Sequence, residues 1–202
     1  MKAIKLGALG AVLVLAAAAG VAVAGVAVAG ATATRTREVI YQAFTASGAP
    51  AIHVERTVKG SCNGGSSAAD RDDAWRCFAG NFVYDPCFSS AKDTGIVLCP
   101  DGAGATTGIE IKLTAKLTLP NKRKPSTSVL PWAVETTSGA KCVLASGASS
   151  VLDGKRANYF CSKTKDALWG GPSRTTEPWT IYAAPGNAKK LTTKVKLSVA
   201  WF

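Results

Sequence analysis

Residues 109–119 read Ile-Glu-Ile-Lys-Leu-Thr-Ala-Lys-Leu-Thr-Leu, and this stretch decides the fold class. Every odd position is apolar, and every even position is charged or a threonine. Successive side chains of a β-strand point to opposite faces, so this alternation predicts a strand with one buried and one solvated face.

The end of the chain repeats this pattern. One parity carries Leu191, Val195, Leu197, Val199 and Trp201, and the other carries Thr192, Lys194, Lys196 and Ser198. Short segments at 132–135, 158–161 and 179–183 are rich in β-branched or aromatic residues and predict further strands. Glu38–Thr45 and Ala51–Val58 predict a hairpin around the turn residues Ser47-Gly48-Ala49-Pro50.

One helix is predicted, over Ser66–Trp75, with Ser67 as its cap and Asp70 three residues later. The composition, with 20 Gly, 9 Pro and 18% charged residues, excludes a coiled coil or a collagen-like repeat. The predicted fold class is therefore mainly β: an antiparallel sandwich or partly closed barrel of about eight to ten strands with that one short helix, stapled by three disulfides.

Residues 1–33 resemble an export signal. Lys2 and Lys5 precede a stretch, 6–30, that has no charged residue, and small residues near Ala31 and Ala33 suit a signal peptidase. An uncleaved anchor remains an alternative, because about 25 apolar residues can span a bilayer. We expect a signal peptide over 1–33 and a single β-rich extracytoplasmic domain over 34–202, secreted or associated with the cell envelope. Contact with the membrane is expected only through the N-terminal segment, if it is uncleaved.

The six cysteines predict three disulfides, because an even set in an exported chain is normally oxidised. They are Cys62, Cys77, Cys87, Cys99, Cys142 and Cys161, and their spacing favours pairing each with its neighbour in this order. Sequence alone leaves fifteen pairings open. A metal site is not expected, since no C-x-x-C motif occurs and the only histidine, His53, is distant in sequence from every thiol.

The chain carries 24 basic and 13 acidic residues, a formal charge of +11. If the two alternating strands are neighbours, their solvated faces form one basic surface. Its predicted polyanion-binding residues are Lys112, Lys116, Lys122, Arg123, Lys124, Lys194 and Lys196. Such a surface would attract an anionic envelope polymer. Lysines that only keep the sheet soluble are the simpler interpretation, and nucleic acid is disfavoured because no aromatic residue alternates with the basic ones.

An enzyme is not predicted. Asp70, Asp72, Asp73 and Asp85 could supply the paired carboxylates of a secreted glycan hydrolase, but neighbouring arginines oppose the raised pKa that its general acid needs. His53 is expected to be a solvated strand residue. Trp169, in the segment Leu-Trp-Gly-Gly-Pro, is predicted to be an exposed aromatic that could stack on a ligand.

Several short motifs contain or accompany the cysteines: Gly60-Ser61-Cys62, Ala74-Trp75-Arg76-Cys77, Tyr84-Asp85-Pro86-Cys87-Phe88, Val97-Leu98-Cys99-Pro100, Pro131-Trp132, Asn158-Tyr159-Phe160-Cys161 and Pro178-Trp179-Thr180. Together they resemble a group of secreted actinobacterial domains that has no assigned activity. This resemblance covers roughly residues 60–202 and implies an extracellular location and a disulfide-stapled fold.

We therefore predict an exported, non-catalytic, disulfide-stabilised binding module without a cofactor. Its partner is expected to be an anionic envelope polymer or another secreted protein. The alternatives are a secreted cell-wall glycan hydrolase using the carboxylates near Asp70 to Asp85, and a secreted protein inhibitor.

Overall fold

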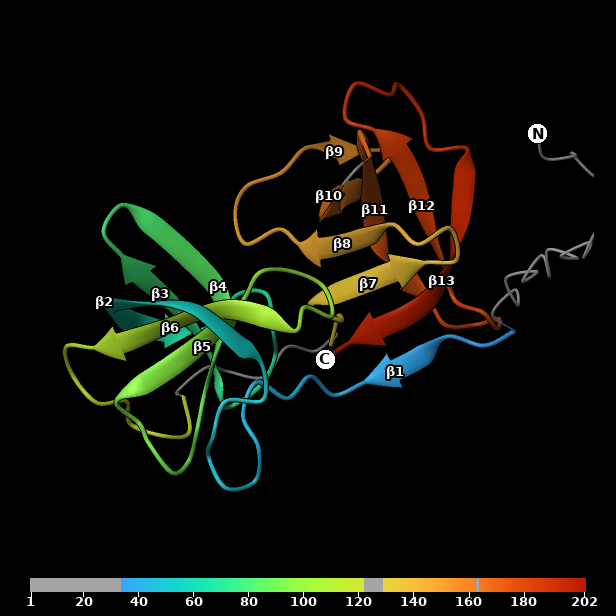
Figure 1. Cartoon of the computed structure of the whole chain (residues 1–202). Helices are drawn as coiled ribbons and strands as arrows, with labels where there is room; N and C mark the ends of the chain where they lie inside the picture. The colour runs from blue at the N-terminus through green and yellow to red at the C-terminus, as the bar shows by residue number, and fades with distance from the viewer. Residues whose placement is uncertain (1–33, 122–128, 163) are drawn as a thin grey trace, which may run out of the picture. The chain divides into compact units, whose positions relative to one another are not determined.

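The computed structural model describes residues 34–121, 129–162 and 164–202, and within these ranges the chain is all β (Figure 1). Thirteen strands form two small closed barrels, one of five strands and one of six, with two short strands paired at the second barrel. The predicted β class is confirmed, whereas the predicted single sandwich or partly closed barrel is wrong. The predicted leader, 1–33, lies outside the described residues.

The five-stranded barrel is built from the first half of the chain. Its strands are β2 (His53–Gly65), β3 (Ala74–Ala79), β4 (Phe82–Ser89), β5 (Ile96–Pro100) and β6 (Thr107–Leu113). Neighbours in this order are antiparallel, and the parallel pairing of β6 with β2 closes the barrel.

The six-stranded barrel is antiparallel throughout. Its strands are β7 (Ala133–Thr136), β8 (Lys141–Leu144), β10 (Lys155–Cys161), β11 (Asp166–Ser173), β12 (Thr180–Pro185) and β13 (Thr193–Trp201). The order is β13-β12-β11-β10-β8-β7, and β7 pairs with β13 to close it. The two extra strands are β1 (Arg37–Val39), parallel to β13, and β9 (Val151–Leu152), which pairs with β10.

Each barrel encloses its own apolar core. The first is filled by Trp75, Cys77, Ala79, Cys87, Val97, Cys99, Ile109 and Ile111. The second is filled by Val134, Cys142, Tyr159, Leu168, Trp179, Ile181, Leu197 and Ala200. Residues one position away in the strands point away from the barrel interior, as the pleat requires. A third buried cluster contains residues of both barrels, among them Phe88 of β4 and Trp201 of β13.

Three disulfides join the pairs that the sequence spacing favoured: Cys62–Cys77, Cys87–Cys99 and Cys142–Cys161. Each links two neighbouring antiparallel strands, namely β2 with β3, β4 with β5, and β8 with β10. Three such bridges indicate an oxidising environment, as found outside the cell.

The predicted helix over Ser66–Trp75 is wrong. Ala74 and Trp75 belong to β3, and the pairing of Gly65 with Trp75 leaves only a short connection between β2 and β3. The Ser66 hydroxyl accepts hydrogen bonds from the backbone N–H groups of Ala68 and Ala69, as a helix cap would. The predicted cap residue, Ser67, instead donates its hydroxyl to the Asp85 carboxylate, and the neighbouring Ser66 stabilises a turn.

The strand predicted over 109–119 is too long, because β6 ends at Leu113. Beyond it the Leu117 N–H donates to the Thr94 carbonyl, and Leu117 and Leu119 pack against the core of the five-stranded barrel. The predicted hairpin over 38–58 is also mostly wrong. Its turn forms at Thr45–Ala49, but the flanking segments share a single bridge, Phe44 with Pro50.

Candidate functional site

Positive charge is distributed unequally between the two barrels. Residues 34–121, which contain the five-stranded barrel, carry nine basic and nine acidic side chains. Residues 129–202, which contain β7 to β13, carry ten basic and four acidic side chains, a surplus of six positive charges. A polyanion would therefore be drawn to the six-stranded barrel, since the other half of the described chain has no net charge.

Two lysines of this barrel lie against one aromatic ring. The Nζ atom of Lys194 is 4.9 Å from the ring centroid of Tyr182, and the Nζ atom of Lys155 is 5.5 Å from the same centroid. Both distances are within the range of a cation–π interaction. We call Tyr182, Lys155 and Lys194 the Tyr182 cluster.

Strand pairing explains how the cluster forms. Tyr182 of β12 is the register partner of Lys194 on β13 and of Trp169 on β11. Lys155 begins β10 and reaches Tyr182 past Gly170, which has a φ of 73°. A Cβ atom on Gly170 would lie 3.3 Å from the Lys155 Cδ atom, so a larger residue there would crowd the lysine side chain.

Further lysines extend the positive surface beyond the Tyr182 cluster. Lys196 is exposed two residues after Lys194 on the same face of β13, and Lys189 and Lys190 are exposed in the turn before β13. The carboxylate of Asp153 accepts a hydrogen bond from the backbone N–H of Leu191 at 2.7 Å. The lysine ammonium groups of this surface bind anions, phosphate included, as point charges.

The predicted basic face of Lys112, Lys116, Lys194 and Lys196 does not form as one surface. Lys112 lies on β6, whose register partner on β2 is Lys59, whereas Lys194 and Lys196 lie on β13 of the other barrel. The sequence predicted two strands with the same pattern correctly but could not show that they belong to different barrels. Lys122, Arg123 and Lys124 lie outside the described residues.

Trp169 was predicted to be exposed, and this prediction is wrong. The residue lies in β11 and is 1% exposed, and its indole N–H donates to the Ala184 carbonyl at 3.1 Å. The Gly-Gly-Pro segment that suggested a loop is an irregular part of a strand, where the register between β11 and β12 shifts. Trp169 therefore packs in a core and is covered from ligands.

Lys155 and Tyr182 were missed by sequence reasoning. They are 27 positions apart and meet only because β10, β11 and β12 are successive neighbours in the sheet. No local spacing signals this arrangement. The nearest sequence signal is the Lys-rich parity of 191–201, which marked Lys194 and Lys196 but not Tyr182, the aromatic partner of Lys194.

Two of the four acidic residues considered for a hydrolase are engaged in structural hydrogen bonds. The Asp85 carboxylate accepts from both hydroxyls of Ser66 and Ser67 and from the Ser67 backbone N–H. Asp73 forms a bidentate ion pair with Arg71, at 2.6 and 2.8 Å. Asp72 is exposed, and Asp70 is half-buried.

His53, the only histidine, is a strand residue at the surface. His53 begins β2, is exposed, and its backbone N–H donates to the Thr106 carbonyl. In the part of the chain that the structure describes, no group of three or more His, Cys, Asp or Glu side chains is placed to hold a metal ion.

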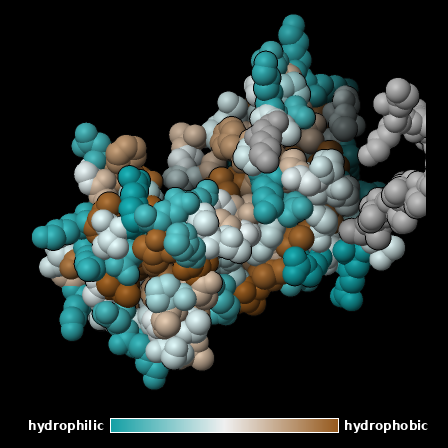
Figure 2. Space-filling view, viewed as in Figure 1, coloured by the Kyte–Doolittle hydropathy of each residue, from teal (hydrophilic) through white to brown (hydrophobic). Residues whose placement is uncertain are grey.

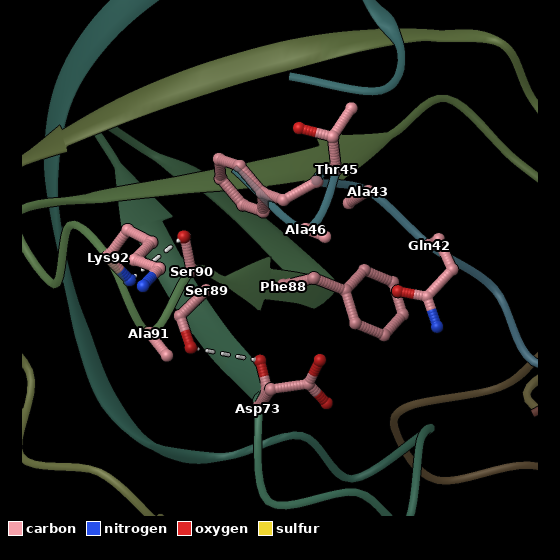
Figure 3. Close-up of a pocket in the computed structure, with 11 residues that line it drawn as sticks. Gln42, Ala43, Thr45, Ala46, Asp73, Phe88, Ser89, Ser90, Ala91 and Lys92 are labelled. Atoms are coloured by element: carbon pink, nitrogen blue, oxygen red, sulfur yellow. Dashed lines mark hydrogen bonds between the residues drawn. The ribbon is translucent and has the colours of Figure 1, made fainter. Parts of the chain in front are cut away.

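A cavity of about 190 Å³ lies beside β4, between Gln42–Ala46 and Ser89–Lys92 (Figure 3). Its serine hydroxyls are already occupied. Ser89 Oγ accepts from the Trp75 indole N–H and donates to the Asp73 carbonyl, and Ser90 Oγ accepts from the Lys92 backbone N–H. The two serine hydroxyls of this cavity therefore serve the fold.

Comparison with protein-family models, with curated proteins and with solved structures finds no match for this chain. Among the described residues there is no helix of the length and apolar character needed to cross a membrane. The functional argument therefore depends on the site itself.

Proposed function

We propose that this protein is an exported, non-catalytic binding module that holds an anionic polymer of the cell envelope on its six-stranded barrel. The observation that carries the proposal is the Tyr182 cluster, in which two lysine ammonium groups lie within 5.5 Å of one ring centroid. The cluster lies in the half of the chain that carries the surplus of positive charge.

Binding would be mainly electrostatic. A flexible polyanion is surrounded by condensed counterions, and lysines that neutralise its charges release them, which favours binding at low salt. The ring of Tyr182 holds each ammonium group within cation–π distance, so both lysines are positioned at the surface of the same barrel. Salt should therefore weaken binding strongly.

The barrel makes this arrangement rigid. Lys155, Tyr182 and Lys194 come from three strands of one closed barrel, and the Cys142–Cys161 disulfide links two strands of the same barrel. A preformed site loses less conformational entropy on binding than a flexible basic tail would. Lysines on a rigid frame can thus bind with useful affinity although each contact is weak.

The test measures retention of the purified protein on immobilised polyglutamate and on immobilised polyglycerol phosphate at increasing salt. A Lys155→Gln, Lys194→Gln double variant should bind more weakly, and the slope of log affinity against log salt should fall by about one to two. Lys59→Gln with Lys112→Gln is the matched control, because these lysines are also register partners but lie on the other barrel.

The control variant should bind like the wild-type protein. Equal loss in both double variants would show that only total charge matters, and unchanged binding in the Tyr182-cluster variant would contradict the proposal. Similar retention on the two polymers is expected at equal charge density, because lysines act as point charges and do not distinguish phosphate from carboxylate by geometry.

A further inference from the structure

The turn of the β3–β4 hairpin exposes two large apolar side chains. Phe82 is 66% exposed and Val83 is 48% exposed. They follow the two-residue turn of Gly80 and Asn81, in which Gly80 has a φ of 58°, as a type II′ hairpin turn requires at its first position. Figure 2 shows hydrophobic residues at the surface over this barrel.

This hairpin is firmly held, so the exposure of Phe82 and Val83 belongs to an ordered structure. The Cys62–Cys77 disulfide ties β3 to β2, and the Cys87–Cys99 disulfide ties β4 to β5. Val83 is the register partner of Phe78 on β3, and the ring centroid of Phe82 is 6.4 Å from that of Tyr84. Phe82 and Tyr84 lie on one face of the hairpin, and Val83 lies with Phe78 on the opposite face. Apolar side chains therefore flank both faces of the hairpin tip, and we call Phe78, Phe82, Val83 and Tyr84 the hairpin patch.

Two arginines border the hairpin patch. The Nη2 atom of Arg56 donates to the Tyr84 hydroxyl at 3.4 Å, and the Cζ atom of Arg76 is 5.8 Å from the ring centroid of Phe78. The nearest carboxylate in sequence, that of Asp85, is already bound by Ser66 and Ser67. The patch therefore combines apolar and aromatic side chains with guanidinium groups.

We propose that the hairpin patch docks onto an anionic lipid surface, with Phe82 and Val83 inserted among the headgroups and acyl chains. Aromatic side chains favour the membrane interface, and arginines beside them can bind lipid phosphates. A stable protein–protein interface buries about 800 Å² on each partner, which the end of one two-residue hairpin does not offer. Two inserted side chains bind a membrane weakly by themselves, so docking also requires the attraction of Arg56 and Arg76 to anionic lipid.

Co-sedimentation tests the contribution of Phe82. The full protein is mixed with vesicles of phosphatidylcholine that contain about one third phosphatidylglycerol, since the proposal requires anionic lipid. Phe82→Ala should lower the partition coefficient by about tenfold or more, as expected for removing a phenyl ring from an apolar environment. Val151→Ala is the matched control, because Val151 is 69% exposed on β9 of the other barrel.

A fluorescent reporter identifies the docking site. All five native tryptophans are buried, at 1–6% exposed, so an additional exposed indole can be distinguished from them. The Phe82→Trp variant should show a blue-shifted emission when vesicles are added, and the Val151→Trp variant should not. A shift in the Val151→Trp variant, a shift in neither variant, or unchanged sedimentation of Phe82→Ala would overturn the proposal.

This inference is independent of polymer binding by the Tyr182 cluster. The Lys155→Gln, Lys194→Gln variant should still dock to vesicles through the hairpin, and the Phe82→Ala variant should still bind polyglycerol phosphate. Vesicle binding that disappears with the two lysines but persists without Phe82 would reject the hairpin patch and leave the proposed function intact.

Discussion

Two tyrosines contribute to the buried structure through hydroxyl groups that remain protonated. The Tyr41 hydroxyl donates to the Ala105 carbonyl at 2.8 Å, and the Tyr159 hydroxyl donates to the Pro131 carbonyl at 2.9 Å. Burial, with a smaller contribution from the charge of Asp101, raises the pKa of Tyr41 to about 12. Burial also raises the pKa of Tyr159 well above its usual value, which nearby Arg174 lowers only partly.

These shifts predict a loss of stability in alkali. An unfolded tyrosine ionises near pH 10, whereas folded Tyr41 does so near 12, so above about pH 10 the unfolded state binds fewer protons. The contribution of both tyrosines is complete below about pH 10 and is lost as the pH rises through the folded values. Urea unfolding across this range measures the effect.

The Tyr41→Phe variant removes one of the two groups, so its stability should fall less steeply with pH than that of the wild-type protein. The Tyr41→Phe, Tyr159→Phe double variant should fall least. An equally steep loss in all three proteins would show that other groups cause the alkaline transition.

At the scale of elements, the disulfides act as local cross-links between paired strands. They close segments of 15, 12 and 19 residues. Chain entropy predicts a stabilisation of about 3 kcal/mol for loops of this size, with differences among the three of only about 0.4 kcal/mol.

Replacing one pair at a time with alanine should therefore lower the free energy of unfolding by similar amounts in the three variants. Denaturant unfolding measures this, and mass spectrometry checks that the remaining two bridges are formed. A much larger loss for one pair would show that its bridge does more than restrict the unfolded chain.

The β class could be predicted from the sequence and the observed cysteine pairing could be favoured over the alternatives, because both depend on local spacing. The residues at which each strand begins and ends could not be predicted. Alternation reports which side chains are buried, and Leu117 and Leu119 are partly buried against the barrel core although their backbone lies outside any strand. The helix cap predicted at Ser67 is likewise replaced by a turn, in which the hydroxyl of Ser66 accepts the backbone N–H groups of Ala68 and Ala69.

The candidate site depended on information that the sequence does not contain. Lys194 was marked by its position on the solvated face of a strand, but its partners Tyr182 and Lys155 are contributed by other strands. Trp169 was wrongly predicted to be exposed because the glycines and proline beside it suggested a loop. Strand β11 instead continues through these residues with a register shift. Contacts between distant segments decided each case.

At the scale of the whole molecule, one buried cluster joins the two barrels. The ring centroid of Tyr41 is 5.3 Å from those of Phe88 and Trp132, and the Phe88 and Trp132 centroids are 6.0 Å apart. Arg71 lies beside them, with its Cζ atom 4.9 Å from the Phe88 centroid and its Nη1 atom donating to the carbonyls of Tyr41 and Phe202. The barrels should therefore unfold together.

Trp132 is a suitable residue for testing this coupling, because it is 1% exposed and contacts both Tyr41 and Phe88. We expect wild-type protein to give one calorimetric transition with equal calorimetric and van't Hoff enthalpies. Trp132→Ala should cost about 3–5 kcal/mol and lower Tm by roughly 10 °C, with the transition broadening or dividing in two as the barrels uncouple. Phe160→Ala, at a half-exposed position of β10, should shift Tm by less than about 2 °C and keep one transition. Two transitions in the wild-type protein would mean that the shared cluster is too weak to couple the barrels.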